Sequence, residues 1–146
     1  MPCEITATVE IAATPEHVWA VLSDLASYPQ WHPVFRSVTG QLAAGSRLTI
    51  TAAHPVTDRT MTARVKVLAA EPPSQLRWVS NLGVYRSDRR FLLSPGEGGT
   101  LLTQTETYRG ILVRFPAKTI ARIQDTFAAI NQAIKQQAEA RQRASG

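Results

Sequence analysis

The sequence predicts an α+β fold in which a curved antiparallel β-sheet of about seven strands wraps around a long C-terminal α-helix. Three observations lead to this prediction. Segments with an apolar residue at every second position open the chain and recur between residues 33 and 109. Turn-forming residues separate these segments closely enough for an antiparallel meander. After Gly110 the apolar residues recur at the spacing of a helix.

The first strand is expected over residues 4–13, where apolar and polar side chains alternate. Thr14 then supplies an N-cap and Pro15 a proline at the first helical position, which together predict the start of a helix. A second cap at Ser23-Asp24 predicts another short helix that ends before Pro29. Two short helices therefore follow the first strand.

Six more strands are expected in the middle of the chain, over residues 34–42, 47–53, 60–70, 75–80, 86–93 and 100–109. The segment Pro95–Gly99 contains three glycines, which tolerate the positive φ angles of a hairpin turn. Short strands joined by such turns predict that neighbouring strands pair antiparallel.

The last part of the chain has an apolar stripe at helical spacing, with Lys118, Arg122 and Asp125 on the opposite side. The stripe consists of Leu112, Pro116, Ile120, Ile123, Phe127, Ile130 and Ile134. A helix from Pro116 to Gln142 would be about 40 Å long, and only the sheet offers enough apolar surface to cover it. Residues 141–146 are expected to fray.

Composition excludes several classes of protein. The 146 residues suit a single domain over residues 1–146, and 44% hydrophobic against 18% charged residues excludes a disordered chain. No apolar run approaches the roughly 20 residues of a membrane span, and the start has no pattern of a secretory signal. Cys3 is the only cysteine, so no internal disulfide can form and a cytoplasmic location is expected.

The net charge of +5 is unevenly placed, because residues 57–146 hold 14 of the 16 Lys and Arg residues and 7 of the 11 Asp and Glu residues. The basic residues are spread among acidic ones, and aromatic residues are not interleaved with them as nucleic-acid stacking requires. We therefore expect no nucleic-acid partner. An acidic protein partner for this half of the chain stays open as an alternative.

Metal and cofactor motifs are missing from the sequence. The three histidines, His17, His32 and His54, do not have the spacing of metal ligands. No glycine-rich phosphate loop and no Gly-x-Ser-x-Gly motif occurs. The sequence thus predicts neither a bound metal nor a cofactor.

Several short motifs occur in order along nearly the whole chain: Thr14–Leu22, Tyr28–Pro33, Pro72-Pro73 before Leu76 and Trp78, Arg90-Phe91-x-Leu93, Gly99-Thr100 and Glu106-Thr107-Tyr108-x-Gly110. Together they resemble the START-like (SRPBCC) superfamily, the helix-grip fold of birch-pollen-type allergens, lipid-transfer domains and polyketide cyclases. The bacterial polyketide cyclase/dehydrase-like branch is the most similar. The resemblance implies a hydrophobic cavity between sheet and helix but no particular reaction. His32 departs from the family, whose members commonly have Asn there.

Strand periodicity indicates which side chains face this cavity. If Leu102 faces inward, then Gln104, Glu106 and Tyr108 do too, and Arg89 accompanies Phe91. By the same alternation, Leu48 and Ile50 bring His54 inward. The residues expected to bind a ligand are Trp31, Phe35, Ile50, Val65, Val67, Leu76, Trp78, Arg89, Phe91, Leu93, Leu102, Gln104, Glu106, Tyr108, Ile120, Ile123 and Phe127.

The sequence leaves more than one function open. The first interpretation is binding or transport of a small hydrophobic or amphipathic molecule, lipid-like or aromatic, without catalysis. The alternative is a polyketide cyclase or aromatase, in which Glu106 would act as general acid or base and Tyr108 as a hydrogen-bond donor. Glu106 can equally pair with Arg89 and only stabilise the sheet. His32 is expected at the surface or as a local hydrogen-bond partner, and the oligomeric state is monomer or homodimer.

Overall fold

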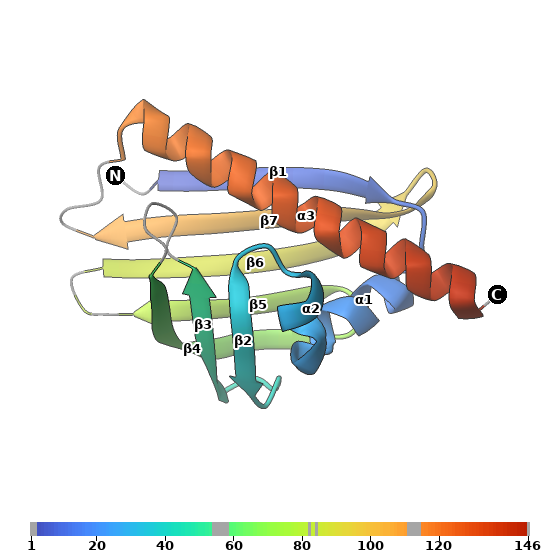
Figure 1. The fold of residues 1–146 in the computed structure, drawn as a ribbon, viewed down its shortest axis with the longest axis horizontal. Coiled ribbons are helices and arrows are strands. Elements are labelled where there is room, and N and C mark those ends of the chain that lie inside the picture. Colours follow the sequence, from blue (N-terminus) through green and yellow to red (C-terminus); the bar gives the residue numbers. More distant parts are fainter. Residues whose placement is uncertain (1–2, 54–58, 82, 84, 111–114, 146) are drawn as a thin grey trace.

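The computed structural model describes residues 3–53, 59–81, 83, 85–110 and 115–145. Its elements are β1 (Cys3–Ile11), α1 (Pro15–Ser23), the 3₁₀ turn η1 (Leu25–Ser27), α2 (Tyr28–Trp31), β2 (Phe35–Gly40), β3 (Arg47–Ala53), β4 (Thr60–Glu71), β5 (Gln75–Asn81), β6 (Tyr85–Gly96), β7 (Gly99–Gly110) and α3 (Ala117–Ser145). Within this part of the chain, the strands form one seven-stranded sheet in the order β1-β7-β6-β5-β4-β3-β2 (Figure 1). The predicted fold class is confirmed.

The sheet is a meander of strands β2 to β7, with β1 added beside β7 as an edge strand. Strands β2 to β6 each pair antiparallel with the strand that follows along the chain, and β1 pairs antiparallel with β7. The register shifts between Phe35 and Ser37 in β2 and between Val67 and Ala69 in β4. Such irregularities bend a strand and increase its twist, so they help the sheet to curve. In Figure 1, α3 crosses β1 and β7 diagonally and ends beside α1.

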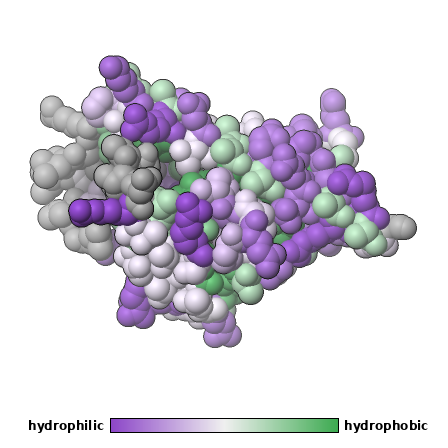
Figure 2. Space-filling view, in the orientation of Figure 1, coloured by the Kyte–Doolittle hydropathy of each residue, from purple (hydrophilic) through white to green (hydrophobic). Residues whose placement is uncertain are grey.

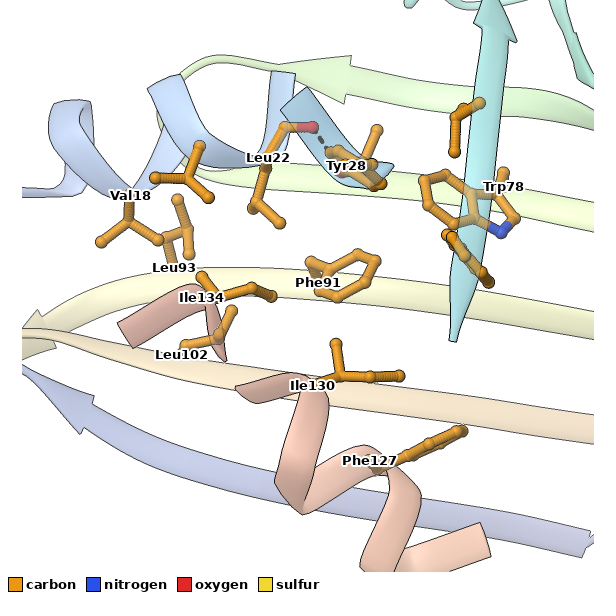
Figure 3. Close-up of a cluster of buried hydrophobic side chains, with 14 of the residues drawn as sticks. Val18, Leu22, Tyr28, Trp78, Phe91, Leu93, Leu102, Phe127, Ile130 and Ile134 are labelled. Carbon is orange, nitrogen blue, oxygen red and sulfur yellow. Dashed lines mark hydrogen bonds between the residues drawn. The ribbon is translucent and has the colours of Figure 1, made fainter. Parts of the chain in front are cut away.

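The predicted alternation of side chains is confirmed, most clearly in β7. Leu102, Gln104, Glu106 and Tyr108 are buried, whereas the residues between them are only half-buried. The buried face meets α3 in a core to which Phe127, Ile130 and Ile134 contribute from the helix, and Val18 and Leu22 from α1 (Figure 3). This core is what fixes the position of α3 over the sheet.

The hairpin predicted around residues 95–99 is present and is tight. Gly96 lies opposite Gly99, so only Glu97 and Gly98 form the turn. Gly99 has φ of +151°, and a Cβ atom at this position would lie 2.6 Å from the carbonyl oxygen of Ala13. The close approach of the chain after β1 therefore requires glycine here.

Two predictions about helix ends are wrong. The second helix does not end before Pro29: α2 includes it, because a proline in the first turn loses no helical hydrogen bond. The C-terminal residues do not fray up to Ser145. There, Nη2 of Arg141 lies 2.8 Å from Oδ2 of Asp24, and the backbone N–H of Thr14 donates to Oε1 of Gln142 at 2.7 Å. These contacts tie the end of α3 to α1.

None of the helices in the described residues is apolar over a length that could cross a bilayer.

Candidate ligand-binding site

A cavity of about 610 Å³ lies between the first half of α3 and the sheet. It is lined by residues just before β2, from β3 and β4, from β6 and β7, and from α3 and the segment just before it. These are Pro33, Val34, Ala53, Met61, Tyr85, Tyr108, Phe115, Thr119, Arg122, Ile123, Thr126 and Phe127. Figure 2 shows apolar residues between the hydrophilic surface of α3 and the ends of β2 and β3. The cavity has the size and apolar character of a small-molecule site.

Aromatic rings form much of the wall. The ring centroids of Tyr108 and Phe115 lie 5.1 Å apart in an edge-to-face arrangement, and those of Tyr85 and Tyr108 are 6.4 Å apart. Burial raises the pKa of both tyrosines, and the nearby carboxylate of Glu106 adds to the effect. Both phenols therefore stay protonated at neutral pH and can donate hydrogen bonds to a bound molecule. Met61, at the other wall, has 54% of its surface exposed, so it is free to cover an apolar ligand.

A buried ion pair lies behind the aromatic wall. Nε of Arg89 donates a hydrogen bond to Oε2 of Glu106 at 2.7 Å, and Nη2 lies 2.6 Å from the same oxygen as an ion pair. The guanidinium carbon lies 5.1 Å from the ring centroid of Phe127 and 5.4 Å from that of Phe35. The pair is thus held between two aromatic rings, which adds a cation–π contribution to the ionic hydrogen bonds. Nη1 of Arg89 is buried without a hydrogen-bond partner among the described residues.

The residues predicted to bind a ligand fall into four groups. Tyr108, Ile123 and Phe127 line the cavity. Trp31 and Ile120 are partly buried beside the core, and Arg89 and Glu106 form the ion pair. The others lie in the packed interior: Phe35, Ile50, Val65, Val67, Leu76, Trp78, Phe91, Leu93, Leu102 and Gln104. Contact of these residues with a ligand stays a prediction.

Several lining residues were not among those predicted, although a pattern points to some of them. Met61 lies an even number of positions along β4 from Val65 and Val67, so the alternation of side chains places it on the same inward face. Thr119, Arg122 and Thr126 are three and four residues apart and therefore share one face of α3. Arg122, expected opposite the apolar stripe, lies instead at the edge of the cavity.

His32 is a buried hydrogen-bond acceptor, so the expected local role is confirmed and a surface position is not. Its Nδ1 accepts hydrogen bonds from the backbone N–H groups of Val34 and Phe35, at 3.1 and 2.9 Å, and its ring stacks on Phe35 at 4.2 Å. Burial, together with the positive charge of Arg89, lowers the pKa of His32 to about 3. The imidazole therefore stays neutral and shapes the chain before β2. His54 lies outside the described residues.

Acid is expected to destabilise the protein through His32. In the unfolded chain the imidazole takes up a proton near pH 6.5, whereas in the folded protein it does so only near pH 3. The contribution of His32 to the free energy of unfolding is therefore fully present above about pH 6.5. Below that pH it falls by about 1.4 kcal/mol per pH unit. In His32→Asn the amide oxygen can accept the same bonds without titrating. Urea unfolding measures the decrease in the free energy of unfolding between pH 7.5 and pH 4.5. We expect this decrease to be about 2–3 kcal/mol larger in wild type than in His32→Asn. Equal losses would show that His32 is protonated in the folded state.

The described residues contain no group of three or more His, Cys, Asp or Glu side chains placed to hold a metal ion. The free cysteine, Cys3, is partly buried at the start of β1. The chemistry that the cavity offers consists of apolar contact, protonated phenols and the guanidinium of Arg122.

Comparisons with known structures agree with this fold. Ara h 8.0201 superimposes with a TM-score of 0.75 at 13% identity, covering 96% of this chain and 99% of that chain. A START superfamily protein from Mycobacterium smegmatis gives 0.75 at 19% identity, covering 98% and 99%. The di-domain ARO/CYC StfQ from the steffimycin biosynthetic pathway gives 0.75 at 13% identity, covering 97% of this chain and 52% of that one. The predicted helix-grip fold and START-like resemblance are confirmed.

The sequence itself identifies the family. A comparison with curated proteins found no match. A comparison with protein families matches residues 2–139 to the family described as "Polyketide cyclase / dehydrase and lipid transport". The match spans almost the whole chain, and the chain therefore belongs to the polyketide cyclase / dehydrase and lipid transport family.

Proposed function

We propose that the protein binds a small hydrophobic or amphipathic molecule, aromatic or lipid-like, in the cavity between α3 and the sheet. Membership of the family implies binding of hydrophobic ligands in general. The observation that carries the proposal for this chain is the cavity of about 610 Å³ with its aromatic and aliphatic wall. Apolar contact supplies affinity at about 25 cal/mol per Å² buried, and the phenols of Tyr85 and Tyr108 orient a polar group.

The position of Glu106 supports binding over catalysis. A general acid or base must reach the substrate directly or through one water, yet Glu106 is not among the residues that line the cavity. Its Oε2 also accepts a hydrogen bond from Nε of Arg89 and forms an ion pair with Nη2. The alternative is an enzyme of the cyclase or aromatase type. In its favour, Tyr108 lines the cavity and lies two residues from Glu106, on the same face of β7.

Other features belong to the same proposal. We infer that residues 1–146 act as one domain, as monomer or homodimer, and that the protein works in the cytoplasm, where its single cysteine stays reduced. It needs no metal, no cofactor and no nucleic acid for binding.

A titration with the uncharged fluorescent probe N-phenyl-1-naphthylamine tests the proposal. We expect saturable one-to-one binding with an increase in fluorescence, because the apolar wall removes the probe from water. Native mass spectrometry of the same sample shows whether a co-purified molecule already occupies the cavity. A linear, non-saturating signal from protein of unliganded mass would contradict the proposal.

A further inference from the structure

A second, strongly basic groove lies on the face of the sheet that points away from α3. It has a volume of about 470 Å³ and contains Arg77, Arg86, Arg90 and Arg109 together with Glu4 and Asp88. These residues come from β5, β6, β7 and β1, at positions that alternate with the buried ones. The groove and the cavity are therefore separated by the sheet itself.

The arginines oppose one another in pairs. Arg77 on β5 is directly opposite Arg90 on β6, and Arg86 on β6 is directly opposite Arg109 on β7. Like charges directly opposite on neighbouring strands destabilise a sheet. Two such pairs on one face therefore lower the stability of the isolated protein, and an anion bound between the members of a pair would relieve this repulsion.

Acidic residues in the groove neutralise only part of this charge. Asp88 accepts hydrogen bonds from Nε and Nη2 of Arg77 at 2.9 and 2.6 Å, and Nη2 of Arg86 lies 3.9 Å from it. The hydrogen bond from Arg77 is the main reason why the pKa of Asp88 is lowered. Arg90 and Arg109 have no ion-pair partner among the residues described. Four arginines against two carboxylates leave the groove with a charge of about +2 at neutral pH.

We propose that this groove binds an acidic, extended peptide segment of a partner protein through two separated carboxylates. The two arginine pairs share β6, where Arg86 and Arg90 are four residues apart, which corresponds to about 13 Å along a strand. Glutamates at positions i and i+4 of an extended peptide have the same separation. Each carboxylate then reaches one arginine pair, in the planar geometry that guanidinium groups favour.

The same groove suits nucleic acid poorly. None of its lining residues is aromatic, so bases have no surface on which to stack. Asp88 also lies on β6 between Arg86 and Arg90, which belong to the two pairs. Its carboxylate repels a nucleic acid, because every nucleotide carries a negative charge. A peptide with three uncharged residues between its two glutamates avoids this repulsion.

Isothermal titration calorimetry with model peptides tests the proposal. The probe is acetyl-Ser-Glu-Thr-Gly-Thr-Glu-Ser-amide, compared with a peptide of the same composition in which the two glutamates are adjacent. We expect the spaced peptide to bind at least about fivefold more tightly at low salt, with affinity that falls as salt rises. The double variant Arg86→Gln/Arg109→Gln should bind the spaced peptide at least about tenfold more weakly. The control double variant Arg64→Gln/Lys66→Gln, on the exposed face of β4, removes the same charge and should change the affinity for this peptide less than about twofold.

Three results would overturn the proposal. They are no binding of the spaced peptide, equal losses in both double variants, or tighter binding of oligothymidylate than of the peptide. The first two mean that the arginines form no specific site, and the last identifies a general polyanion site. Because the groove lies across the sheet from the cavity, the titration with N-phenyl-1-naphthylamine is expected to be unaffected by saturating peptide.

Discussion

Glu106→Gln is expected to lower the free energy of unfolding by about 3–5 kcal/mol. The change leaves the guanidinium of Arg89 charged and buried, with a side chain only 13% exposed and without its carboxylate partner. The cost of an unpaired charge in the interior exceeds that of losing the hydrogen bonds alone. Urea unfolding at pH 7.5 measures the loss.

Two further variants separate the ion pair from general packing. Arg89→Met together with Glu106→Met removes both charges, so we expect most of the lost stability to return. Asp24→Asn breaks the solvent-accessible pair with Arg141, in which the side chain of Asp24 is 42% and that of Arg141 33% exposed, and should cost no more than about 1 kcal/mol. A cost below about 1 kcal/mol for Glu106→Gln would mean that Arg89 reaches water, and the description of a buried pair behind the cavity would be wrong.

Thr126→Trp is expected to abolish ligand binding without unfolding the protein. Thr126 is half-buried on α3, lines the cavity, and its hydroxyl donates only to the carbonyl of Arg122 in the same helix. An indole at this position takes up much of the space that a ligand would occupy. We therefore expect the affinity for N-phenyl-1-naphthylamine to fall at least tenfold, which is about 1.4 kcal/mol or more.

Ala128→Trp provides the matched control for the blocked cavity. Ala128 is an exposed residue two positions further along α3, so the same indole is placed outside the cavity. Its affinity for the probe should stay within about twofold of wild type, and both variants should unfold within about 1 kcal/mol of it. Equal affinities of the two variants would place the probe elsewhere on the protein.

Most of the fold could be predicted from local patterns. Residues 47–53 were expected as a strand and form β3, and the Thr14-Pro15 start of α1 has the expected cap, in which Oγ1 of Thr14 accepts from the N–H of His17. Such features depend on neighbours in sequence. The helical structure at Arg141 and Gln142 does not depend on neighbours in sequence. It is held by contacts with Asp24 and Thr14, which are more than a hundred residues away in the chain.

The site could be predicted only in part, for a related reason. A period of two is enough to place Arg89 and Glu106 on the same inward face. Whether the space beside an inward residue is filled depends on side chains from distant segments. Leu102 and Phe91 are covered by α3 and α1, whereas Tyr108 meets a cavity because only the start of α3 faces it. The alternation of side chains along a single strand therefore cannot predict whether the space beside an inward-facing residue is filled or empty.

The measurement that tests the central claim most directly is the set of intermolecular nuclear Overhauser effects between N-phenyl-1-naphthylamine and methyl-labelled protein. We expect cross-peaks from the probe to the methyl groups of Val34 just before β2, Met61 on β4 and Ile123 on α3, all of which line the cavity. Methyl groups of Val18 and Leu22, which belong to α1 and are packed into the core, should show none. Cross-peaks only to Thr105 and Thr107, on the outer face of β7, would contradict the account, because they would place the apolar ligand outside the cavity.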